Sequence, residues 1–318
     1  MDYDIFNGDA DGICALIQLR KSEPRDATLV TGVKRDINLM DKVQAGQGDR
    51  LTVLDVSMDK NKSALDRALV TGASVFYVDH HFPGEIPQHP ALNSIINESP
   101  DTCTAALVNG HLRGAHLDWA VTGAFGDNLN NTARTLAKGL DVSATDLAKL
   151  EQLGVCINYN GYGPSIDDLH FDPEDLYRRL FAAPSALEFV STSADFTRLS
   201  EGYAADMSMA QDLVPSHAND KVAVFQLPDE AWARRVSGVY SNDLATGNPD
   251  RAHAVLTSKA NGNYLVSVRA PLNNKQGAVD LCMQFPTGGG RAAAAGINDL
   301  PLERLDDFVE AFSASYGS

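Results

Sequence analysis

The first part of the chain alternates short apolar runs with helical patterns. The runs Asp4–Phe6, Leu51–Leu54 and Val75–Val78 lack polar alternation, which is typical of strands buried on both faces of a parallel sheet. Helical stretches such as Ile13–Arg20 and Lys62–Thr71 lie between them. Strands that alternate with helices predict an α/β fold with a doubly wound, mainly parallel sheet.

The middle of the chain has a different pattern. From Thr132 to Met209 it is mainly helical and rich in Leu and Ala, apart from Asn158–Gly163, which is expected to form a turn. The segment Pro215–Asp220 is short and polar and begins with proline, so it is the best linker candidate. We therefore expect a first domain with a helical extension over residues 1–214, a linker over 215–220, and a second domain over 221–318.

The last part of the chain predicts a smaller α/β domain. Val222–Gln226, Ala254–Ser258 and Tyr264–Val268 are expected to be strands, the last with apolar and polar residues in alternation. A glycine loop, Gly288–Gly290, is followed by an amphipathic helix over Pro301–Tyr316.

Composition and charge narrow the function. The chain has 318 residues, of which 44% are hydrophobic, enough for two packed cores. Its formal net charge is −16 and it shows no basic stripe, which argues against a long nucleic-acid partner because phosphate neutralisation supplies much of that affinity. The four cysteines are scattered, and neither a leader segment nor an apolar run long enough for a membrane helix is visible. A cytoplasmic protein without a membrane partner is expected.

Acidic residues follow each predicted strand of the first domain. They are Asp9 and Asp11, then Asp55, then Asp79-His80-His81, with Asp127 further along the chain. Ligands of open α/β sheets bind outside the carboxyl ends of the strands, so these groups are expected to converge. Each aspartate taken alone could equally cap a helix. Two adjacent histidines beside an acid are better explained by metal or phosphate chemistry.

Such a cluster predicts bound cations, because uncompensated carboxylates in one cleft would repel each other. Asp and His ligands without a thiolate suit Mn²⁺ best, with Mg²⁺ as the alternative. Two cations bridged by one carboxylate would hold a phosphoryl group and activate water near neutral pH.

These residues resemble the motifs of the DHH/DHHA1 phosphoesterases, a superfamily that includes nanoRNases, cyclic-dinucleotide phosphodiesterases, pAp phosphatases and the exonuclease RecJ. Asp9-Ala10-Asp11-Gly12 is similar to its first motif, Asp55 to the second, Asp79-His80-His81 to the third and Asp127 to the fourth. Gly288-Gly289-Gly290-Arg291 and Ser267-Val268-Arg269 resemble its C-terminal signature.

The resemblance implies two Mn²⁺ ions. Asp55 would bridge them, Asp9 would bind one, and the other would be held by Asp11, His80 and Asp127. Asp79 would orient His80, and His81 would contact the phosphate or assist the leaving oxygen while a metal-activated hydroxide attacks phosphorus.

The first motif departs from the family pattern. Ile5 stands where nanoRNase-like members carry a His, and Asn7 stands where RecJ-like members carry an Asp. The Asn7 amide oxygen or water is expected to complete the shell of the first ion.

Substrate contacts are expected mainly in the second domain. The backbone of Gly288, Gly289 and Gly290 can approach an anion closely, although a glycine run can also be merely flexible. Arg291 and Arg269 could add bidentate contacts to a phosphate or a guanine edge. In the first domain, Lys34 and Arg35 could reach the phosphate or simply be solvated.

The expected function is Mn²⁺-dependent hydrolysis of linear dinucleotides such as pGpG, or of very short oligoribonucleotides, to mononucleotides. The alternatives are a pAp phosphatase or other phosphomonoesterase of small nucleotides, and a nucleotide sensor without catalysis. The sequence leaves the oligomeric state open, with a homodimer as one option.

Overall fold

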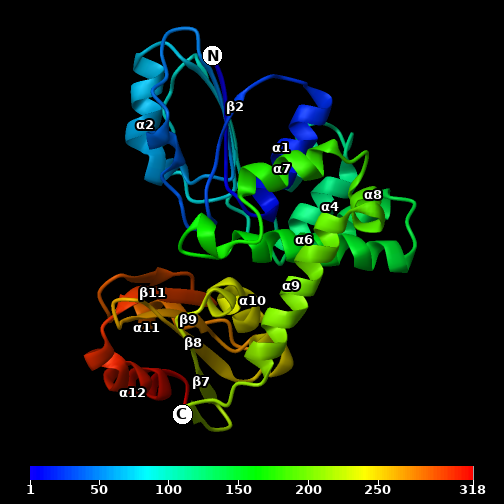
Figure 1. Cartoon of the computed structure of the whole chain (residues 1–318). Coiled ribbons are helices and arrows are strands. Elements are labelled where there is room, and N and C mark those ends of the chain that lie inside the picture. Colours follow the sequence, from blue (N-terminus) through cyan, green and yellow to red (C-terminus); the bar gives the residue numbers. More distant parts are fainter. Residues whose placement is uncertain (318) are drawn as a thin grey trace. The chain divides into compact units, whose positions relative to one another are not determined.

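The computed structural model describes residues 1–317, which form two compact units (Figure 1). The first unit runs from Met1 to Gly202 and the second begins at Tyr203, so the boundary lies inside helix α9 (Ala194–Gln211). Within the segment expected to be a linker, His217–Ala218 forms strand β6, which pairs with a strand of the second unit.

The first unit contains a parallel sheet of five strands in the order β2-β1-β3-β4-β5. The order reverses at β1, so the carboxyl ends of β1 and β3 form a topological switch point. The predicted doubly wound fold is confirmed. The strands are β1 (Asp2–Phe6), β2 (Thr28–Val30), β3 (Arg50–Leu54), β4 (Ser74–Asp79) and β5 (Leu92–Ile96).

Helices cover both faces of this sheet (Figure 1). The side chains of Ile5, Val53 and Tyr77 point to one face and pack with α2 (Met58–Val70) in a buried apolar cluster. On the opposite face, Arg20 of α1 (Ala10–Ser22) forms a buried ion pair with Asp4 of β1 at 2.5 Å. The alternation of side chains along each strand produces this division.

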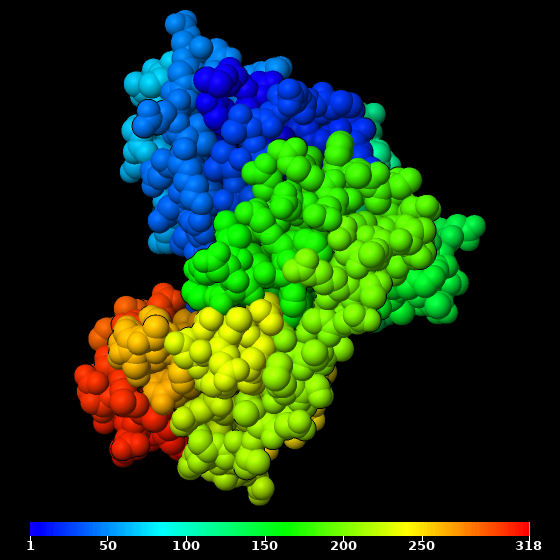
Figure 2. Space-filling view, in the orientation of Figure 1, coloured from blue at the N-terminus to red at the C-terminus, as the bar shows by residue number. Residues whose placement is uncertain are grey.

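A helical segment completes the first unit. Its helices are α3 (Thr104–His111), α4 (Leu117–Gly126), α5 (Asn130–Leu136), α6 (Ala144–Gly161), α7 (Pro173–Ala182) and α8 (Ala186–Thr192). Figure 2 shows the stretch from α6 to α8, in green, against the N-terminal segment, in blue, and both α6 and α7 contact α1.

The expected turn at Asn158–Gly163 is wrong for most of its length, because α6 continues to Gly161. The buried Asn160 amide bonds to the backbone of His170 and Phe171, and Asn158 accepts a hydrogen bond from Lys34. These tertiary hydrogen bonds use the amide groups that would otherwise compete with helix formation.

The second unit contains a mixed sheet in the order β10-β11-β9-β8-β7-β6, in which β7 and β8 are parallel. The expected strands are present, and α12 packs Phe308 and Phe312 into the apolar cluster on the sheet. The elements are β7 (Val222–Leu227), β8 (Ala252–Ser258), β9 (Tyr264–Arg269), β10 (Gly288–Gly290), β11 (Ala294–Leu300), α10 (Ala231–Gly247), α11 (Ala278–Cys282) and α12 (Leu305–Tyr316).

Ser143→Ala should destabilise the first unit by about 1 kcal/mol, measured by urea unfolding. The Ser143 hydroxyl caps α6 by accepting a hydrogen bond from the Asp146 N–H at 3.1 Å. Ser57→Ala is the matched control, because Ser57 occupies the cap position of α2 without a side-chain capping bond. Equal effects of the two changes would contradict the capping role.

Candidate metal centre

The acidic residues predicted from the sequence lie at the carboxyl ends of the central strands. Asp9 and Asp11 follow β1, Asp55 follows β3, and Asp79 ends β4 with His80 and His81 directly after it. Adjacent parallel strands end at the same edge of the sheet, which brings these side chains to the switch point.

The turn after β1 holds its two aspartates in different ways. Asp9 caps α1, and its Oδ1 accepts hydrogen bonds from the Asp11 and Gly12 N–H groups at 3.0 and 3.1 Å. The carboxylate oxygens of Asp11 accept from the Thr104 and Ala105 N–H groups, both at 2.7 Å. Asp11 therefore sits at the N-terminus of α3, where unpaired N–H groups favour a negative charge.

Asp55 adopts a left-handed backbone conformation, with φ 58°, directly after β3. Aspartate tolerates this region better than most residues, and strained backbone often marks functional sites. Its Oδ1 accepts a hydrogen bond from the Thr104 hydroxyl at 3.3 Å, so α3 helps to orient a second carboxylate.

His80 lies at the centre of the carboxylates. Its Nε2 is 3.5 Å from an Asp55 oxygen, 3.8 Å from Asp11 and 4.0 Å from Asp127, which follows the last residue of α4. Its Nδ1 lies 3.0 Å from the Thr102 carbonyl oxygen. A carbonyl can only accept, so Nδ1 carries a hydrogen and Nε2 faces the carboxylates, where it can bind a cation once its own proton is lost.

Asp79 contacts His81 and not His80, the histidine that it was expected to orient. The resemblance implies that Asp79 orients His80, but Asp79 Oδ1 lies 2.7 Å from His81 Nδ1. The second Asp79 oxygen is buried without a hydrogen-bond partner. The His81 side chain is 46% exposed, so Asp79 holds a ring that solvent and ligands can reach.

The pKa values of three carboxyl groups in the cluster are raised, which shows that the cluster has too little positive charge to balance its carboxylates. Burial and then the Asp55 carboxylate raise the pKa of Asp11 to about 7. Burial and then Asp9 raise the pKa of Asp55 to about 6, and burial raises that of Asp127 to about 6. Burial alone would lower the pKa of His80, but the neighbouring carboxylates raise it to about 10. A cation bound here would displace these protons.

The donor set fits a divalent cation. Among the described residues, two groups of three could each hold a metal ion, because the ligand atoms within a group lie within 4.8 Å of one another. One group is Asp11, His80 and Asp127, and the other is Asp55, His80 and His81. Carboxylate oxygens and an imidazole suit Mn²⁺ or Mg²⁺. Since His80 has only Nε2 available, it can serve just one of these groups at a time.

Asn7 and Asp9 belong to neither of these two groups and contact each other and Lys34. Asn7 Oδ1 accepts from the Asp9 N–H at 3.3 Å, and Asn7 Nδ2 donates to the Lys34 carbonyl oxygen at 3.3 Å. The Lys34 ammonium group forms an ion pair with Asp9 Oδ2. Burial would raise the pKa of Asp9, but Lys34 lowers it. The neighbouring Arg35 is exposed.

Sequence reasoning missed two contributors to this site. Asn158 was assigned to a turn, yet its Oδ1 accepts from Lys34 at 2.9 Å. The Thr102 carbonyl oxygen, which selects the His80 tautomer, carries no sequence signal because every residue has such a group. A buried amide within the apolar face of a long helix was the available signal for Asn158.

The predicted substrate residues of the second domain all belong to the second unit. Arg269 Nε donates to Asn242 Oδ1 at 2.8 Å, and Arg291 is exposed. The glycine loop forms β10, paired with β11. Gly290 has φ +139°, and a Cβ there would lie 2.5 Å from the Ala295 Cα, so packing alone requires glycine at this position.

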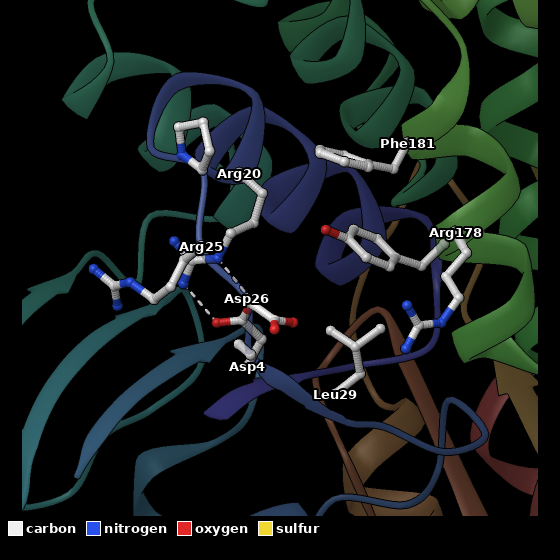
Figure 3. A pocket seen from close by; sticks show the side chains of 10 residues that line it. Asp4, Arg20, Arg25, Asp26, Leu29, Arg178 and Phe181 are labelled. Carbon is white, nitrogen blue, oxygen red and sulfur yellow. Dashed lines mark hydrogen bonds and ion pairs between the residues drawn. The ribbon is translucent and has the colours of Figure 1, made fainter. Parts of the chain in front are cut away.

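A separate hollow of about 630 Å³ lies at the other end of α1 (Figure 3). Arg20, Arg25 and Arg178 line it with the aromatic rings of Tyr177 and Phe181. Its arginines pair with the carboxylates of Asp4, Asp2 and Glu174, respectively. The positive charge is therefore largely neutralised within the protein.

The described residues include no helix that is long and apolar enough to cross a membrane.

No protein-family model matches this sequence, and no curated protein matches it. Solved structures do resemble its fold. RecJ from Thermus thermophilus in complex with Mn²⁺ has a TM-score of 0.67 and 18% identity, over 98% of this chain and 51% of that chain. The chain thus spans about half the length of that RecJ.

In two further solved structures, the match covers a larger share of the neighbour's chain. The pGpG-specific phosphodiesterase PggH from Vibrio cholerae has a TM-score of 0.57 and 16% identity, over 99% of this chain and 100% of that chain. An exonuclease RecJ bound to manganese has a TM-score of 0.60 and 17% identity, over 98% of this chain and 89% of that chain. The chain therefore has the same fold as RecJ and PggH, in keeping with the resemblance of its motifs to the DHH/DHHA1 phosphoesterases, RecJ among them.

Proposed function

We propose that this chain is a DHH/DHHA1-type phosphodiesterase that requires Mn²⁺ and hydrolyses a short nucleotide, a linear dinucleotide such as pGpG or a very short oligoribonucleotide. The observation that carries the proposal is the convergence of Asp11, Asp55 and Asp127 on His80 Nε2 at 3.5–4.0 Å. Ligands of one octahedral cation stand about 3–4 Å apart when each bond is about 2.1 Å, so this spacing suits a single ion.

The short substrate is supported by two features. PggH, described as specific for pGpG, matches this chain over the full length of both, whereas the Thermus RecJ is about twice as long. The net charge of −16 disfavours a long polyanion, since 42 acidic residues outnumber the 26 Lys and Arg residues that could neutralise its phosphates.

The chain's own residues prepare the site for a phosphate ester. The N-terminus of α3 holds Asp11, and the Thr104 hydroxyl orients Asp55, so both carboxylates are placed before any ligand arrives. Asp79 fixes the exposed His81 ring through Nδ1 and leaves Nε2 for a phosphate oxygen or the leaving oxygen. A divalent cation, when bound, supplies positive charge for the phosphate and lowers the pKa of water.

The four cysteines are free and buried, which agrees with the cytoplasmic location that we propose.

The test is nucleotide release from pGpG, pApA, pAp, a five-nucleotide RNA and pyrophosphate by metal-free protein, with and without added Mn²⁺. We expect turnover of the dinucleotides with Mn²⁺, loss of activity on chelation and poor support by Ca²⁺. Fastest release from pAp would replace the proposal with a phosphomonoesterase. Binding of pGpG without turnover would identify a nucleotide sensor, and full turnover after exhaustive metal removal would exclude the metal mechanism.

A further inference from the structure

Lys34 contacts Asp9, the carboxylate to which the family resemblance assigns one metal ion. Its ammonium group forms an ion pair with Asp9 Oδ2 and donates to Asn158 Oδ1 at 2.9 Å. The same nitrogen lies 5.5 Å from the centre of the Tyr162 ring. A carboxylate, an amide oxygen and an aromatic face are three groups that favour a cation at this position.

The lysine is held there by its backbone as well. The Lys34 N–H donates to the Gly161 carbonyl oxygen at 2.9 Å, and the Lys34 carbonyl accepts from Asn7 Nδ2 at 3.3 Å. The segment also packs closely, because a Cβ on Gly8 would lie 2.0 Å from the Gly32 carbonyl oxygen. The Lys34 side chain is 23% exposed. Lys34 is therefore a built part of the site and not a solvated surface lysine.

Both carboxylate oxygens of Asp9 already have partners within the protein. Its Oδ1 accepts the two N–H groups at the start of α1, and its Oδ2 pairs with Lys34. The Asn7 amide oxygen, expected to complete the shell, is turned to the Asp9 N–H, and Ile5 has no ligand atom. Neither group of metal-ligating residues found among residues 1–317 includes Asp9.

We propose that the Lys34 ammonium group replaces the ion that Asp9 would hold, so that the site binds one divalent cation, at Asp11, Asp55, His80 and Asp127. This inference rests on the proposed function. The lysine supplies a permanent positive charge beside Asp9, while the exchangeable cation binds at His80. Metal activation should then follow a single binding step.

The test counts metal ions without substrate. Metal-free protein is titrated with Mn²⁺ by calorimetry, and the desalted complex is analysed by inductively coupled plasma mass spectrometry. We expect one Mn²⁺ per chain in the wild type and in Lys34→Arg, the matched control that retains the charge. Lys34→Ala should gain a second, weaker site, because Asp9 Oδ2 becomes free. Adding Asp9→Asn to Lys34→Ala should remove that second site.

The wild-type stoichiometry decides the question even if a variant fails to fold, which circular dichroism would reveal. Two ions per wild-type chain, reduced to one by Asp9→Asn, would overturn the inference while leaving the phosphodiesterase proposal intact. A folded Lys34→Ala that still binds one ion would show that the lysine does not exclude the second. A wild-type chain that binds no Mn²⁺ would overturn both proposals.

Discussion

Asp55→Asn is expected to lower kcat/KM for a dinucleotide by more than about 100-fold and to reduce Mn²⁺ occupancy, exceeding the usual effect of residues that only orient a ligand. Asp55 Oδ1 lies 3.5 Å from His80 Nε2 and 3.9 Å from His81 Nδ1, and the Thr104 hydroxyl holds it. An amide keeps the size of the side chain but removes the charge that attracts the cation. Rate and metal content should therefore fall together.

Asp79→Asn is the comparison for this prediction. Asp79 is fully buried and contacts His81 Nδ1, so its change should reduce the rate while leaving most of the bound metal in place. Calorimetric titration with Mn²⁺ measures both variants, beside their kinetics on pGpG. Wild-type metal content in Asp55→Asn, or a greater loss of metal in Asp79→Asn, would contradict the assigned roles.

Arg269→Ala and Arg291→Ala should slow turnover of dinucleotides by roughly 10–150-fold in kcat/KM, which corresponds to losing a charge-assisted contact of about 1.5–3 kcal/mol. Asn242 orients the Arg269 guanidinium group through Nε, and Arg291 is exposed on the second unit beside β10. If these side chains hold one end of the substrate, the dinucleotide should depend on them most. Turnover should also fall as the substrate lengthens beyond a few nucleotides.

The measurement compares pGpG, a five-nucleotide RNA and bis-p-nitrophenyl phosphate, a minimal ester that lacks a second nucleotide to bind. The loss should be large for pGpG and small for the minimal ester, with metal content unchanged. Arg304→Ala is the matched control, because Arg304 is an arginine of the same unit that pairs with Asp307. Equal losses on all three substrates would assign Arg269 and Arg291 to folding instead of recognition.

The local pattern of residues was sufficient to predict the central strands of the first sheet and the acidic residues that follow them. β1, β3 and β4 are central strands rich in apolar residues, and burial on both faces leaves that signal in the sequence. β2 and β5 were not predicted. They are the edge strands of the same sheet, only partly buried, and their composition is mixed, as in Leu92–Ile96. An edge strand acquires its structure from its neighbour more than from its own residues.

The sequence by itself determined that Asp11, Asp55, His80 and Asp127 exist at the ends of successive elements, because a parallel sheet brings such ends together. Only the tertiary structure decided which partner each side chain has. Lys34 contacts Asp9, which is 25 residues away in the sequence, and Asn158, which is 124 residues away. Asp79 contacts His81 instead of His80. These choices depend on distances between side chains from separate elements, and no periodicity along the chain records such distances.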